Sequence, residues 1–315
     1  MQDNKKTCYR GWIRQVPIYL GKFFRMFIYM DDWKLLPMAA LIAALVSYVI
    51  KGSMAVTMEG TLKGSLAISC ICIWNGFFNS IQVVCRERNI IKREHRGGMY
   101  LRSYIFSHMI YQASLCICQA IITTLVCVMA GIHFPSESIV THSVLFDLTI
   151  TFFLITYASD MMSLLISCIA KTTTAAMTIM PFVLIFQLLF SGAVFTLEGG
   201  AKIISEFTIA KAGMCAICAV VGYNSLPTRA AWNMLNQFKE FTYDGMQPIK
   251  LFVETIEKEG RVEELCLKAG QETQKIEYAS TINNITSCWF TLLIFAFIFA
   301  LLALIALRRI DNDKR

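Results

Sequence analysis

The sequence predicts an all-α, polytopic membrane protein. Hydrophobic residues occupy 56% of the 315 positions and charged residues only 16%, and the mean hydropathy is +0.55, which is too apolar for a soluble chain. The apolar residues form long runs, and at about 1.5 Å per residue each run can cross a bilayer core of about 30 Å. We therefore expect six transmembrane helices, at 33–50, 66–84, 104–132, 144–170, 175–195 and 288–307.

Residues 1–32 are predicted to form a cytoplasmic tail and an interfacial connecting helix. Between positions 10 and 30, Arg14, Lys22 and Arg25 fall on one helical face, and aromatic and aliphatic side chains form the other. This pattern is typical of a helix that lies in the headgroup layer. A cleavable signal peptide is not indicated, because the segment is mixed rather than uniformly apolar.

A strongly basic segment separates the second and third predicted spans, within the 33–196 region that holds spans one to five. Glu87 and Glu94 are seven residues apart, so on a helix they share a face. Gly97 and Gly98 are expected to end that helix. The segment at 86–98 is therefore interpreted as a charged helix that docks a cytoplasmic partner, or as a plain basic inner loop. Its basic residues are Arg86, Arg88, Lys92, Arg93, Arg96 and Arg102.

The distribution of basic residues predicts that both termini are cytoplasmic. With six spans in this orientation, the inner segments contain 18 Lys and Arg, whereas the two short outer loops contain only Lys51 and Lys63. This asymmetry is the usual orientation signal of multi-pass proteins of the plasma membrane. The nine basic residues of the long segment after position 196 do not count against it, because long loops cross regardless of charge.

The long segment before the last span is predicted to have two parts. Residues 197–223 are apolar but interrupted by glycines, and no uninterrupted run is long enough to span, so we expect a re-entrant outer hairpin. Residues 224–283 are polar with helical patterns and predict a small extracytoplasmic helical loop. Residues 284–315 then contain the sixth span and a cytoplasmic tail.

Enzymatic and metal chemistry are not indicated. No G-x-x-x-x-G-K-[ST] loop is present in the sequence, so no ATP hydrolysis by this chain is expected. The histidines and cysteines lack zinc-ligand spacing, and neither a catalytic residue nor a metal site is predicted. Cys215 and Cys218 form a C-x-x-C, but its apolar flanks favour packing over a redox pair.

Asp160 lies well inside the fourth predicted span. A carboxylate at that depth is costly unless it is paired or hydrated, so it should face the helix bundle. Three interpretations remain open: a proton or cation relay, a polar patch on a substrate path, and a packing residue hydrogen-bonded by neighbours such as Ser159 and Ser163.

The second predicted span is unusually rich in amides and aromatic residues. Asn75 and Asn79 are four positions apart and therefore share a stripe with Cys72. This stripe could contact a transported compound or bond a neighbouring helix, since amides do both in membranes.

Two stretches resemble motifs of the permease half of ABC exporters of the G-subfamily type. ERNIIKREHRGGMYLRSY, at 87–104, is similar to the family's E-R-x-x-x-x-R-E-x-x-x-G-x-Y stretch between spans two and three. PFVLIFQLLFSGAVF, at 181–195, is similar to its fifth-span signature ending in F-S-G. The order of segments along nearly the whole chain also agrees with that family.

The resemblance implies that 86–98 is a coupling helix that contacts an ABC ATPase. The residues expected to carry this contact are Glu87, Arg88, Arg93, Glu94 and Arg96. The two glutamates are also expected to pair with basic residues of the connecting helix such as Arg14 or Arg25. ATP and Mg²⁺ would be bound by that partner, which is either a separate subunit or a part removed from a fusion.

The resemblance also implies a dimer of permeases, with itself or a sister chain, and a substrate path between spans two and five. The path would include Cys72, Asn75, Asn79, Pro181, Ile185 and Leu188. Ala193 and Val194 stand where the family has a bulky outer gate, so a tight apolar plug is not expected there.

The predicted function is ATP-driven export of a hydrophobic, lipid or peptide compound, with membrane lipid and no nucleic acid among its partners. One alternative is an ion-coupled secondary transporter in which Asp160 is central, although no inverted repeat is evident. The other is an immunity or structural membrane protein that transports nothing.

Overall fold

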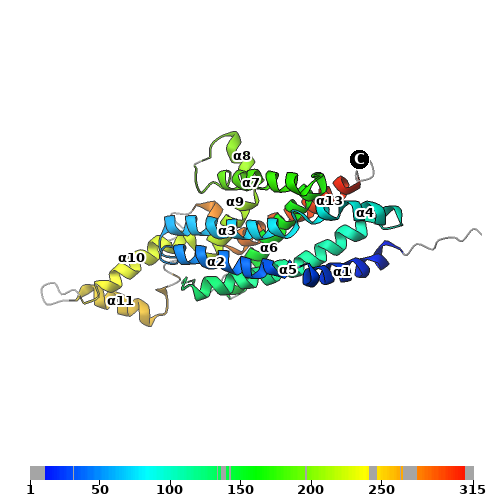
Figure 1. Ribbon diagram of the computed structural model, residues 1–315. Coiled ribbons are helices and arrows are strands. Elements are labelled where there is room, and N and C mark those ends of the chain that lie inside the picture. Colours follow the sequence, from blue (N-terminus) through cyan, green and yellow to red (C-terminus); the bar gives the residue numbers. More distant parts are fainter. Residues whose placement is uncertain are drawn as a thin grey trace, which may run out of the picture.

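The computed structural model describes residues 11–30, 32–132, 134–135, 140–141, 143–195, 197–240, 247–262, 264 and 275–308. Over these residues every regular element is a helix (Figure 1), which confirms the all-α fold class. The predicted tails at 1–10 and 309–315, and parts of the outer loop at 241–246 and 265–274, lie outside the described residues.

The N-terminal half forms the connecting helix, three long helices and a short charged one. The elements are α1 (Trp12–Tyr29), η1 (Asp32–Lys34), α2 (Leu35–Ile50), α3 (Met58–Ser80), α4 (Val83–Arg96) and α5 (Leu101–Met129). Thr57 caps the N-terminus of α3 by accepting a hydrogen bond from the Gly60 amide. Helix α3 begins at Met58, eight positions before the predicted span at 66–84, because the polar turns around Glu59 and Lys63 belong to the same helix.

The C-terminal half contains two long apolar helices, a shorter apolar helix and a group of short helices. These are α6 (Val144–Ile169), α7 (Thr173–Leu189), α8 (Gly200–Glu206), α9 (Ile209–Val221), η2 (Tyr223–Ser225), α10 (Leu226–Gln237), α11 (Pro248–Lys258), η3 (Ile276–Tyr278) and α13 (Ile282–Leu307). Among the described residues, the stretches that contain α2, α3, α5, α6 and α13 are long and apolar enough to cross a membrane.

Two elements differ in length or shape from a simple span. Helix α7 is apolar but has only 17 residues and ends at Leu189, before the predicted end at 195. Helices α8 and α9 form a pair bent by 74°, a shape that a broken span and the expected re-entrant hairpin at 197–223 would share. All residues of α9 except Ala212 are buried, so its backbone and side chains are covered by the other helices.

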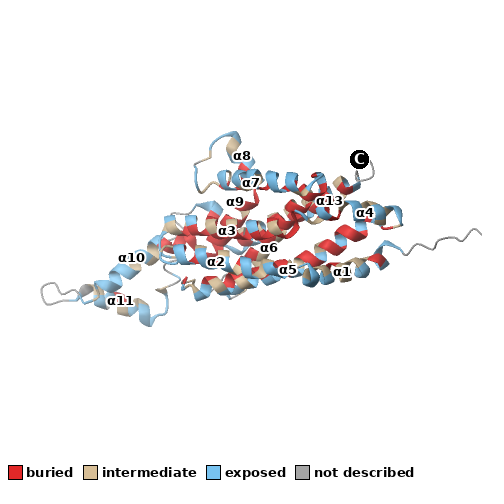
Figure 2. Ribbon diagram, viewed as in Figure 1, coloured by how far each residue is buried: buried red, intermediate tan, exposed pale blue. Residues whose placement is uncertain are grey.

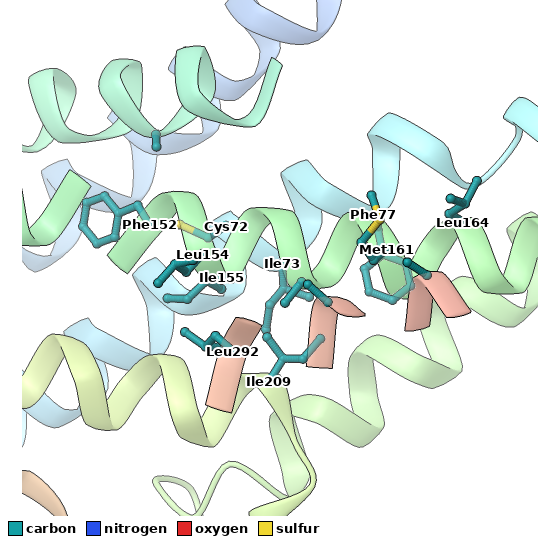
Figure 3. Close-up of a cluster of buried hydrophobic side chains, with 14 of the residues drawn as sticks. Cys72, Ile73, Phe77, Phe152, Leu154, Ile155, Met161, Leu164, Ile209 and Leu292 are labelled. Carbon is teal, nitrogen blue, oxygen red and sulfur yellow. The ribbon is translucent and has the colours of Figure 1, made fainter. Parts of the chain in front are cut away.

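Helix α6 is the centre of the bundle and packs against α3, α5, α9 and α13. Buried residues follow α3, α6 and α9, whereas α10 and α11 are mostly exposed (Figure 2). Figure 3 shows the apolar cluster formed by α3, α6, α9 and α13. Its labelled members are Cys72, Ile73, Phe77, Phe152, Leu154, Ile155, Met161, Leu164, Ile209 and Leu292.

The contact between α3 and α6 depends on one glycine. A Cβ atom at Gly76 would lie 2.3 Å from the Thr156 carbonyl oxygen and 2.8 Å from the Asp160 amide nitrogen. The absence of a side chain therefore lets the two backbones touch, a common device where lipid provides no hydrophobic drive for helix association. We call this contact the α3–α6 crossing.

The two ends of the bundle carry different elements. Helices α1 and α4 lie at one end, and α10 and α11 project from the opposite end (Figure 1). Helix α10 packs against α11 and contacts η2. Because η2 in turn contacts α3 and α9, it connects the α10–α11 pair to the bundle.

Candidate functional site

One lysine joins α1 to α4. Lys22 Nζ lies 3.3 Å from Glu87 Oε2 and 3.7 Å from Glu94 Oε1. Glu87 is only 4% exposed and its Oε2 also lies 3.5 Å from the hydroxyl of Tyr104, which donates to it. We call Lys22, Glu87, Glu94 and Tyr104 the α1–α4 junction.

The sequence predicted that Glu87 and Glu94 pair with basic residues of the connecting helix such as Arg14 or Arg25, and a basic residue of that helix does pair with both, but it is Lys22. Both arginines are exposed, and Lys22 forms the ion pairs instead. The reason is the rotation of α1 about its axis, which turns Gln15, Tyr19 and Lys22 toward α4 and α5 and points Arg14 and Arg25 away.

Tyr19 brings a phenol beside Glu94 at the junction. Its burial, and then the neighbouring Glu94 carboxylate, raise the pKa of Tyr19 to about 12. The phenol therefore stays protonated at neutral pH and can donate to Glu94.

Polar side chains that the sequence analysis did not assign also bind α1. Gln15 Nε2 donates to the Gly98 carbonyl oxygen at 3.1 Å, and its Oε1 accepts from the Tyr100 amide at 3.0 Å. Ser103 and Ser107 donate to the α1 carbonyl oxygens of Trp12 and Val16. The spacing of the two serines, four positions apart, is the only sign of this face in the sequence. These bonds fix α1 against the end of α4 and the first turns of α5.

The other side of α4 is attached to the C-terminus of α6. The Arg88 guanidinium donates to the carbonyl oxygens of Cys168 at 3.2 Å and Ala170 at 3.0 Å. Ser167 Oγ accepts from the amides of Val84 and Cys85. A cation at the end of a helix satisfies otherwise unpaired carbonyl groups and opposes the helix dipole, so Arg88 positions α4 rather than pointing outward.

The remaining face of α4 is exposed. Arg93 and Arg96, which the resemblance assigned to partner contact, lie on it beside Asn89 and Ile90. Ile90 is an exposed apolar side chain between cationic ones. This combination can bind a partner surface that has an apolar recess and an acidic rim.

A second candidate site is an apolar groove between α3 and α7. Two adjoining cavities of about 450 and 400 Å³ share Cys70, Trp74 and Leu188. Pro181 and Ile185 line the second cavity, so the three path residues assigned to span five do lie together. We call this surface the α3–α7 groove.

The span-two residues predicted for the path lie elsewhere. Cys72, Asn75 and Asn79 are buried within the chain, and none of the three lines the groove. The Asn79 amide pairs reciprocally with Gln119 of α5, at 2.9 and 3.0 Å. The face of α3 that meets the groove is instead marked by Trp74, which is 42% exposed.

Ala193 and Val194, the predicted outer gate, follow the end of α7. Gly192 precedes them with φ +81°, a left-handed backbone conformation that glycine adopts without a steric penalty. Val194 is exposed. Gln187 Oε1 accepts from the Ala210 amide at 3.1 Å, which joins the last turn of α7 to the start of α9.

Asp160 is fully buried, as its depth in the span predicted. Its expected partners are wrong: Ser159 Oγ donates to the Ile155 carbonyl oxygen, and Ser163 Oγ donates to the carbonyl oxygens of Gly76 and Asp160 itself. Within the described part of the chain neither carboxylate oxygen of Asp160 has a hydrogen-bond partner.

The two cysteines of the C-x-x-C lie in α9. Cys215 and Cys218 are buried free thiols in an apolar cluster beneath the outer helices. Within the described ranges no group of three or more His, Cys, Asp or Glu side chains could hold a metal ion.

Comparison with known families gives one match. A family model described as ABC-2 type transporter matches residues 21–207, from within α1 through α8. No curated protein sequence matches the chain. The matched region contains the α1–α4 junction, the α3–α7 groove and Asp160, and it ends before α9 and the outer helices.

Proposed function

The chain belongs to the ABC-2 type transporter family as a membrane-embedded permease, and on this premise we propose that it exports a hydrophobic or amphipathic compound. Permeases of this family work with an ABC ATPase and are not themselves the catalytic subunit. We place α4 at the contact with that ATPase, and both termini on its cytoplasmic side. We also propose that the chain dimerises, with itself or with a sister permease.

The attachment of α4 carries this proposal. Lys22 ties α4 to α1, and Arg88 ties it to the end of α6. A movement imposed on its exposed face would therefore reach two other helices without first bending α4. A plain basic loop would need no such attachments. This favours a transmission helix over the two non-ATP alternatives.

The exposed face of α4 can be tested with the ATPase. Arg93→Glu should weaken co-purification of the ATPase and lower the ATP turnover of the reconstituted complex about tenfold, because it reverses a charge at the contact. Lys250→Glu, the same change on the exposed surface of α11, is the matched control. Equal behaviour of the two variants would remove α4 from the contact.

The α3–α7 groove supports an apolar cargo. Its two cavities are lined almost entirely by apolar side chains, with Lys63 and Gln187 as the polar exceptions. A groove of this composition binds flat or amphipathic molecules mainly by excluding water. We propose that a second permease faces the groove and encloses the path, as the exposure of Trp74, Phe182 and Ile185 suggests.

Cargo recognition can be tested by stimulation of ATP turnover with a panel of amphipathic compounds. Trp74→Ala and Leu188→Ala should reduce stimulation, with Trp74→Ala the larger loss because an aromatic ring contributes more contact area. Phe290→Ala, which removes an exposed aromatic ring of α13 outside the groove, should have no effect. Loss in Phe290→Ala alone would move the path away from this groove.

A further inference from the structure

Four buried side chains meet where the last turn of α3 touches α5 and α6. Ser80 comes from α3, His108 and Gln112 from α5, and Asp160 from α6. All four are at most 1% exposed. None of them belongs to the α1–α4 junction or lines the α3–α7 groove. We call them the Ser80 cluster.

Ser80 is the centre of the cluster. Its Oγ lies 2.9 Å from His108 Nε2 and accepts from Gln112 Nε2 at 3.0 Å. The Asp160 carboxyl group lies beside the same hydroxyl, at a geometry short of a formed hydrogen bond. A single hydroxyl thus stands between an imidazole and a carboxyl group.

The cluster has several unsatisfied polar atoms. Both carboxylate oxygens of Asp160, Nδ1 of His108 and Oε1 of Gln112 have no hydrogen-bond partner among the described residues. Buried polar atoms are nearly always paired, so a group of orphans at one place needs an explanation. A proton or an ordered water that bridges them would supply one.

The charged groups around Asp160 determine whether its carboxyl group is protonated or ionised. Its carboxyl group faces Tyr111 and Cys116 of α5 and Tyr157 of α6. In the described part of the chain no lysine or arginine interacts directly with it. Besides Asp160, the charged side chains that act on the neighbouring Tyr111 are Asp32 and Arg86, which lie 3.8 Å apart and oppose each other. An ionised Asp160 would therefore be an unpaired charge inside a membrane bundle, which is strongly disfavoured.

We propose that the Ser80 cluster is a proton-binding site, in which Asp160 holds one proton in this conformation beside the Ser80 hydroxyl. With the Ser80 hydroxyl donating to His108 Nε2, the neutral imidazole carries its hydrogen on Nδ1, which is the orphaned nitrogen. The acid and the imidazole are then both neutral, so the buried cluster carries no net charge.

The position of the site links the proton to helix packing. Gly76 holds α3 against the backbone of Asp160 one turn before Ser80. Separation of α3 from α6 would move Ser80 away and admit water to the carboxyl group. The proton is therefore held while the α3–α6 crossing is closed and released when it opens.

Infrared spectroscopy of the full chain in lipid nanodiscs tests the proposal. Asp160 should give a protonated-carboxyl C=O band at neutral pH that shifts in D₂O and is lost in Asp160→Asn. The matched control is Asp147→Asn, which changes the other buried acid of α6, one that accepts a hydrogen bond from Thr141 at 2.6 Å. The band should survive that change. A band unaffected by Asp160→Asn would overturn the proposal.

Two further measurements test the proposal if Asp160→Asn does not fold, and they distinguish a bound proton from a bound cation. Ser80→Ala in the otherwise native chain should shift the frequency of the same band, and an unshifted band would remove Ser80 from the site. Thermal stability is then compared in sodium and choline chloride. If sodium stabilises the native chain and no protonated-carboxyl band is present, the site holds a cation and the proton assignment is wrong.

Discussion

The α1–α4 junction and the α3–α6 crossing each bury an acidic side chain, but only the junction provides polar partners for its carboxylate. At the junction, Glu87 has the Lys22 ammonium and the Tyr104 hydroxyl within reach. At the crossing, neither carboxylate oxygen of Asp160 has a hydrogen-bond partner among the described residues. The junction is held by charge, whereas the crossing is held by the close approach of two backbones at Gly76. The two regions should therefore respond differently to mutation.

The largest effect is expected from filling the crossing. Gly76→Ala places a methyl group against the Thr156 carbonyl oxygen, and because backbone cannot move aside as a side chain can, unfolding free energy should fall by about 3 kcal/mol. Denaturant unfolding in lipid bicelles measures it. Gly21→Ala, at a helical glycine of α1 with open space around it, is the control and should cost nothing. Equal stability of the two variants would contradict the close contact.

Breaking the junction should have the next largest effect. Lys22→Met leaves the buried Glu87 without its cation, which should cost about 2 kcal/mol. Arg25→Met removes an exposed charge from the same helix and should be near neutral. A double-mutant cycle with Glu87→Gln measures the coupling, and a coupling energy near zero would show that the ion pair contributes no stability.

The amide pair between α3 and α5 should contribute less. Asn79→Ala removes both hydrogen bonds to Gln119, and interhelical hydrogen bonds in membranes average less than those of soluble proteins, so about 1 kcal/mol is expected. Asn79→Ala and Gln119→Ala should be strongly non-additive in unfolding measurements. Additive losses would mean that the two amides act independently.

The smallest effect on stability is expected at the exposed face of α4. Arg96→Ala should change the unfolding free energy by less than about 0.5 kcal/mol, because its side chain lies on the surface. The same variant should lose ATPase binding in a pull-down. A stability loss as large as that of Lys22→Met would place Arg96 inside the junction rather than outside it.

The sequence was sufficient for features that depend on long apolar runs. The predicted span at 144–170 matches α6 to within one residue at its end. The prediction was less accurate where polar turns extend a helix beyond the apolar core, as at the start of α3 and at Ile282–Leu307. A hydropathy pattern detects the part of a helix that lies in the hydrocarbon core, and it does not detect the water-exposed turns that extend the helix beyond that core.

The site residues show the same division. The periodicity placed Glu87 and Glu94 on one face, and one lysine does contact both. Which base occupies that face depends on how α1 is rotated against α4, and this is set by tertiary contacts such as those of Gln15. For the same reason the pattern correctly grouped Cys72, Asn75 and Asn79 as one stripe but placed it on the path beside α7. The stripe is buried instead, and Asn79 pairs with Gln119 of α5.

The shortness of α7 has a consequence for the surrounding lipid. Seventeen residues rise only about 26 Å, which is less than a typical hydrocarbon thickness of about 30 Å. Tilting would only shorten its projection across the bilayer further, and its C-terminal end is joined to α9 through Gln187. Acyl chains beside α7 must therefore compress, and the free energy of the protein depends on chain length. Shorter-chain lipids should gather along this side of the molecule, which would make bilayer thickness a determinant of where in a membrane the protein resides.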